Sequence, residues 1–119
     1  FIVVAPQCPE GMRWVESDWT PGKYNLKSTA TSTPTKLLTS LLYNDIFKNY
    51  SVDLGRVYGA GLSMGGFGTW NLLMNHSDVF AAGVPICGGA DHRKADIMKD
   101  VPLMELAEKT MVDIIRIVY

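Results

Sequence analysis

One serine lies between two glycines, at Gly61, Ser63 and Gly65, and this Gly-x-Ser-x-Gly spacing constrains the fold more than any other feature of the chain. A short strand-like run at residues 56–60 precedes the motif, and apolar residues at helical spacing follow it. A strand, a sharp turn and a helix in this order hold the serine in strained backbone geometry and expose its hydroxyl. We expect glycine at Gly61 and Gly65 because side chains there would collide with the neighbouring strand and helix. The pattern predicts that Ser63 is a nucleophile on a nucleophile elbow.

Met64 follows the serine at the first turn of the expected helix. Backbone N–H groups in a first helical turn lack intrahelical partners and lie in positive potential. The Met64 N–H is therefore placed to bind a developing oxyanion.

Two other glycine-rich sites fit the sequence less well. In a dinucleotide-binding Gly-x-Gly-x-x-Gly pattern that starts at Gly59 and Gly61, the third glycine position is occupied by Met64. A phosphate-binding loop would need Gly-Lys-Ser or Gly-Lys-Thr, and neither occurs in the chain.

The flanks of the motif resemble the esterase branch of the α/β-hydrolase superfamily, whose members are described as phospholipase/carboxylesterase-like or prolyl-oligopeptidase-like. The segments that carry the resemblance are the elbow itself, residues 1–9 with Trp14, residues 50–53 leading into residues 56–58, and residues 80–89. The resemblance extends over residues 1–94, and residues 95–119 do not match the family. It implies an α/β fold: a partial α/β-hydrolase sheet, mostly parallel, with flanking helices.

The resemblance also implies acyl transfer by a serine, an acid and a histidine, in that chain order. Of the two histidines, His92 follows the strand expected at residues 81–86 and is the candidate base, with Asp91 as the candidate acid and Asp96 as a substitute. His76 is expected to be structural, because the helix after the elbow separates it from Ser63. The family's own histidine and acid follow later strands, and its His-Gly oxyanion loop has no counterpart in this sequence.

The length and composition of the chain are typical of a single domain, which extends over residues 1–119. We expect this domain to be an incomplete piece of a longer enzyme. With 47% hydrophobic residues, 19% charged residues and a net charge of −1, the chain lacks the excess of positive charge that binds nucleic acid or an anionic membrane. We expect a small-molecule ester substrate and neither a cofactor nor a metal. Cys8 and Cys87 are expected to be free thiols, because they end strands that are too far apart for a disulfide.

Several further elements are predicted from local patterns. Residues 1–5 read as a buried strand, and Thr33-Pro34 reads as the start of a helix with a capping hydroxyl. Residues 103–109 look helical and residues 114–119 look like a strand. In the family another strand separates those that match residues 1–5 and 56–60, so we expect these two to pair directly or the chain to form a homo-oligomer.

The sequence thus predicts a serine carboxylic-ester hydrolase that acts through Ser63 and an acyl-enzyme. Two alternatives stay open: a catalytically crippled fragment, and a non-enzymatic small-molecule binding module on the same scaffold. The approach of a competent histidine to Ser63 would separate the enzyme from both alternatives.

Overall fold

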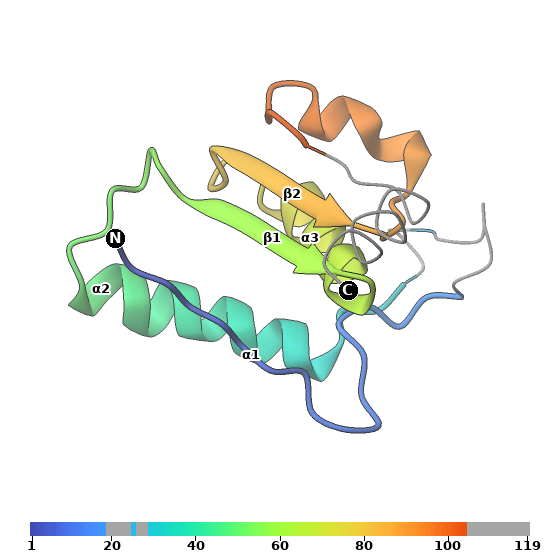
Figure 1. Ribbon diagram of the computed structural model, residues 1–119, viewed down its shortest axis with the longest axis horizontal. Helices are drawn as coiled ribbons and strands as arrows, with labels where there is room; N and C mark the ends of the chain where they lie inside the picture. The colour runs from blue at the N-terminus through green and yellow to red at the C-terminus, as the bar shows by residue number, and fades with distance from the viewer. Residues whose placement is uncertain (19–24, 26–28, 105–119) are drawn as a thin grey trace, which may run out of the picture.

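The computed structural model of the chain describes residues 1–18, 25 and 29–104. Along these residues two strands and several helical segments alternate as expected for an α/β chain (Figure 1). In chain order they are α1 (Thr33–Leu41), the π-helical turn η1 (Leu42–Ile46), α2 (Phe47–Asn49), β1 (Tyr58–Leu62), α3 (Met64–Asn75), β2 (Ala82–Ile86) and the 3-10 helix η2 (His92–Met98).

The strands β1 and β2 form a parallel pair, connected by α3 (Figure 1). Tyr58 lies opposite Ala82 and Leu62 lies opposite Ile86, so the carboxyl ends of the two strands meet at one edge of the sheet. The second edge of β2 is extended by a parallel bridge between Gly83 and Leu103. The strand predicted at residues 56–60 begins two residues later, because Arg56 belongs to the preceding turn, where its Nε lies 2.7 Å from Asp53 Oδ2.

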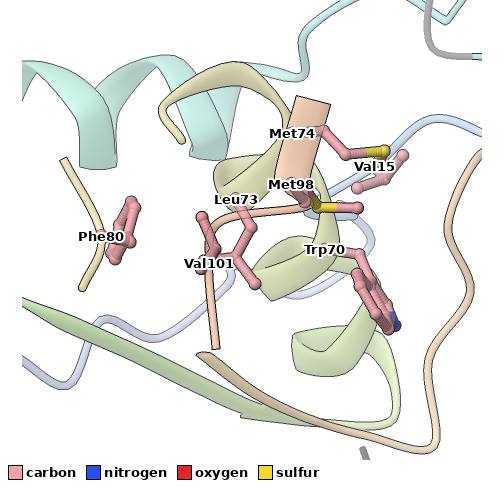
Figure 2. Packing of buried hydrophobic residues seen from close by; sticks show 7 residues of the cluster. All are labelled: Val15, Trp70, Leu73, Met74, Phe80, Met98 and Val101. Carbon is pink, nitrogen blue, oxygen red and sulfur yellow. The ribbon is translucent and has the colours of Figure 1, made fainter. Parts of the chain in front are cut away.

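The hydrophobic core joins α3 to the loop after β2 and to the N-terminal segment. Figure 2 shows its seven buried side chains, which are Val15, Trp70, Leu73, Met74, Phe80, Met98 and Val101. Leu73 is fully buried, and its side chain fills the space that Gly83 leaves on β2. Because the same helix begins at the elbow, this packing fixes the position of Ser63 relative to the sheet.

The helix predicted from Thr33-Pro34 begins where expected, but Ser32 caps it. Ser32 Oγ accepts a hydrogen bond from the Thr35 N–H and donates one to the Trp14 carbonyl at 2.6 Å. Thr35 Oγ1 donates a second bond to the same carbonyl, also at 2.6 Å. The two hydroxyl groups thereby tie the start of α1 to Trp14, whose side chain packs against Gly68 of α3.

The strand predicted at residues 1–5 is wrong. These residues form neither a helix nor a strand, Figure 1 draws them as a coil that crosses α1 in this view, and Phe1 and Val3 are exposed. Direct pairing of this segment with β1 is also wrong, because the described residues place β2 alone beside β1. An extended apolar run forms a strand only where a ladder partner satisfies its backbone groups, and none lies beside it in the described chain. The expected homo-oligomer stays a prediction.

The end of the described chain differs from expectation at two positions. Leu103 and Met104 were predicted to begin a helix, but Leu103 forms the β-bridge to Gly83 and the Met104 N–H donates to the Gly83 carbonyl at 3.0 Å. Residues 105–109 of that predicted helix and the strand predicted at residues 114–119 lie outside the described residues. No helix in the described part of the chain combines the length and the apolar character needed to cross a membrane.

Candidate active site

Ser63 lies on the sharp turn between β1 and α3, as the motif predicts. Its φ of 54° and ψ of −111° fall in a region that L-residues rarely adopt, and its side chain is exposed. The Ser63 N–H donates to the Ile86 carbonyl at 2.7 Å, which extends the β1–β2 ladder into the turn. The sheet therefore holds the strained residue while its hydroxyl faces outward.

The two glycines of the motif play different parts. A Cβ on Gly61 would overlap the Gly65 carbonyl group and come within 2.7 Å of Thr69 Oγ1. The close approach of β1 to the first turn of α3 thus requires glycine at position 61. A Cβ on Gly65 would meet no atom within 4 Å, so the expected collision at Gly65 does not occur among the described residues.

The backbone at the start of α3 offers a free donor beside the serine. Ser63 is the N-cap residue, its side chain makes no capping bond, and its carbonyl accepts from the Phe67 N–H at 3.1 Å. Within the described chain the Met64 N–H has no hydrogen-bond partner. It stands at the positive end of a helix of 12 residues, where a negative charge developing next to Ser63 would be stabilised.

The structure places the candidate base and acid in the loop after β2, which leaves the same edge of the sheet as the elbow. His92 is the first residue of η2 and is exposed, and in the described residues no hydrogen bond joins it to Ser63. Asp91 is only 1% exposed, and its carboxylate accepts from Arg93 Nε at 2.8 Å and from Arg93 Nη2 at 3.2 Å. This pairing raises the pKa of the Arg93 guanidinium above its ordinary value. Asp91 is thus held by Arg93 in this arrangement.

His76 lies at the C-terminal end of α3, whereas Ser63 precedes its first residue. A helix of 12 residues spans ~18 Å, so the two side chains are separated by the length of the helix. The His76 Nδ1 and the Tyr43 hydroxyl share a hydrogen bond at 3.2 Å. This contact agrees with the expectation that His76 is structural.

Sequence reasoning missed the conformation of Cys87. It directly follows β2 and has a φ of 52°, so both parallel strands end in a non-glycine residue with positive φ. The next residue, Gly88, packs so closely on the backbone of Gly66 and Phe67 that no side chain fits there. The consecutive glycines 88 and 89 were the only sequence signal of this approach. Cys87 and Cys8 are both free thiols, as expected.

The described residues contain no group of three or more histidine, cysteine, aspartate or glutamate side chains that could hold a metal ion. Their arrangement supports a nucleophile with one oxyanion donor.

No protein-family model matches the chain. Over 41 residues the chain is 49% identical to poly(3-hydroxyalkanoate) depolymerase C from Paucimonas lemoignei, which covers 34% of this chain and 10% of the depolymerase. A solved structure described as a thermostable esterase is similar with a TM-score of 0.69 and 33% sequence identity, covering 84% of this chain and 25% of the esterase chain.

These similarities confirm the resemblance to α/β-hydrolase esterases and show that the β1–α3–β2 unit is part of an α/β-hydrolase fold. The chain spans about a quarter of the length of the esterase that it matches.

Proposed function

We propose that the chain supplies the nucleophile of a serine hydrolase that cleaves carboxylic esters. The observation that carries the proposal is the geometry of Ser63, an exposed serine with a φ of 54° between a parallel strand and the start of α3. Similarity to an esterase and to a poly(3-hydroxyalkanoate) depolymerase supports ester substrates, because a polyhydroxyalkanoate is a chain of ester-linked hydroxy acids. Esters with small or aromatic acyl groups are the proposed substrates.

In the proposed reaction Ser63 Oγ attacks the ester carbonyl carbon. The hydroxyl proton passes to a base, and the carbonyl π electrons move to the oxygen, which the Met64 N–H binds. Collapse of this intermediate breaks the bond to the alcohol, which leaves with the proton, and an acyl-enzyme remains. Water then attacks the acyl carbon in the same way and releases a carboxylic acid and free Ser63.

Covalent labelling tests this function without needing a known substrate. We expect a fluorophosphonate to modify Ser63 and no other serine, because the elbow exposes this hydroxyl beside a helix N-terminus. Intact-mass analysis should show one adduct that Ser63→Ala eliminates and that the exposed-serine control Ser51→Ala retains. An adduct that survives in Ser63→Ala would rule out Ser63 as the nucleophile.

We further propose His92 as the base, since it lies in the loop that leaves the elbow edge of the sheet. General-base help contributes ~10²–10⁴-fold, so His92→Ala should lower kcat/KM for a nitrophenyl ester by about that factor. His76→Ala is the matched control, and it should leave the rate unchanged while it removes the bond to Tyr43.

A second candidate, a catalytically crippled fragment that keeps the elbow as a scaffold, is supported by the lack of a base and an acid beside Ser63 in the described residues. Ser63 and His92 share no hydrogen bond in the described residues, and Asp91 is paired with Arg93. Equal and negligible effects of His92→Ala and His76→Ala on a slow hydrolysis would favour this candidate over the enzyme.

A further inference from the structure

An open cavity at the protein surface lies beside α1, away from the candidate active site. The space within it is about 360 Å³, and five of the residues that line it are exposed. Residues 31–44 and the end of α3 contribute its lining, which consists of Thr31, Lys36, Thr39, Ser40, Tyr43, Asn44 and His76. His76 ends α3, whereas Ser63 precedes it, so the length of that helix separates the cavity from the elbow.

The π-helical turn η1 brings two of the lining residues to the cavity. Tyr43 and Asn44 both lie within η1, which interrupts the otherwise α-helical stretch from α1 to α2. Single π-helical turns are rare and occur frequently at functional sites. The turn and the cavity therefore coincide at Tyr43 and Asn44.

The cavity is rich in hydrogen-bond donors. Lys36 makes no ion pair with a carboxylate in the described residues. Ser40 Oγ accepts a bond from Asn44 Nδ2 at 3.1 Å, which leaves the Ser40 hydroxyl proton available to another acceptor. An ammonium group and a hydroxyl donor in the same lining match a ligand that carries an oxyanion.

The rest of the lining includes two aromatic rings. The Tyr43 ring has its centroid 5.6 Å from that of His76, and its hydroxyl is bound to His76 Nδ1. Phe47 supports Tyr43 from another side by an edge contact at 5.5 Å. Burial, and to a smaller extent the charge of Asp78, raises the pKa of the Tyr43 hydroxyl above its ordinary value, so this hydroxyl is uncharged at neutral pH.

We propose that this cavity is a second binding site, distinct from Ser63, for a small carboxylate with an apolar body. Lys36 and Ser40 bind the carboxylate, and the Tyr43 and His76 rings contact the apolar part. The site does not depend on the proposed ester hydrolysis, although an ester hydrolase would release ligands of this class.

Proton NMR of the 119-residue chain tests the proposal, because its two histidines report on different places. Titration with benzoate should shift the ring signals of His76, which lines the cavity, and leave those of His92 unchanged. Benzyl alcohol, which has the same ring without the charge, and inorganic phosphate, which has charge without the ring, should each bind at least about tenfold more weakly than benzoate.

Three variants complete the experiment. Lys36→Gln should weaken benzoate binding by about tenfold, whereas Lys99→Gln, at an exposed lysine outside the cavity, and Ser63→Ala should not change it. Unchanged benzoate affinity in Lys36→Gln, or a shift of His92 in place of His76, would overturn the proposal. Loss of benzoate binding in Ser63→Ala would do the same, because it would assign the ligand to the elbow.

Discussion

Replacing Ser63 with alanine is expected to lower ester hydrolysis by about 10³-fold or more, to a rate near that without protein. The substitution removes the hydroxyl that forms the acyl bond, but it keeps the Cβ and therefore the backbone conformation with a φ of 54°. We accordingly expect the midpoint of urea unfolding to stay the same. Initial rates with a nitrophenyl ester and an unfolding curve for the same preparation measure both quantities.

Ser63→Gly is the informative companion variant. Glycine adopts positive φ without steric cost, whereas a strained non-glycine residue costs ~1–3 kcal/mol. The variant should therefore be inactive and more stable than the parent chain. Hydrolysis that persists in both variants would contradict the assignment of the nucleophile.

Gly61→Ala should lower the free energy of unfolding by about 3 kcal/mol. The added Cβ would overlap the Gly65 carbonyl group and press on Thr69, and both belong to α3, which cannot move without disturbing the core. Because the same movement would displace the elbow, hydrolysis should fall as well. Urea denaturation followed by circular dichroism measures the loss of stability.

Gly65→Ala provides the matched control within the same motif. A Cβ at Gly65 meets no atom within 4 Å, and alanine is the better helix former by up to ~1 kcal/mol. This variant should be as stable as the parent chain or slightly more stable. If Gly61→Ala and Gly65→Ala destabilised the chain equally, the close approach seen at Gly61 would not be the reason for its glycine.

The features that the sequence predicted well are encoded locally. The order of strand, turn and helix around Ser63 follows from the spacing of two glycines and the apolar pattern on either side. The start of α1 could also be predicted from local sequence, since a run of hydroxyl residues before Pro34 marks a helix N-terminus. Local sequence did not predict which hydroxyl acts as the cap, because Ser32 is selected by its additional bond to the Trp14 carbonyl, 18 residues earlier.

The features that the sequence missed depend on distant parts of the chain. The apolar, β-branched residues 1–5 have the composition of a strand, but no ladder partner lies beside them in the described residues. The pairing of Asp91 with Arg93 could not be distinguished from a pairing with His92, because both partners are near in sequence. The π-helical turn η1 has no sequence signature that we recognised.

Trapping the acyl-enzyme tests the central claim, that Ser63 is the nucleophile of an ester hydrolase, most directly. The chain would be mixed with a nitrophenyl ester, quenched in acid during turnover, digested, and analysed by tandem mass spectrometry. We predict that the acyl mass is found on the peptide that contains Ser63, on the serine itself, and that Ser63→Ala carries none. Acylation of another residue, or turnover without any acyl adduct on Ser63, would contradict the account.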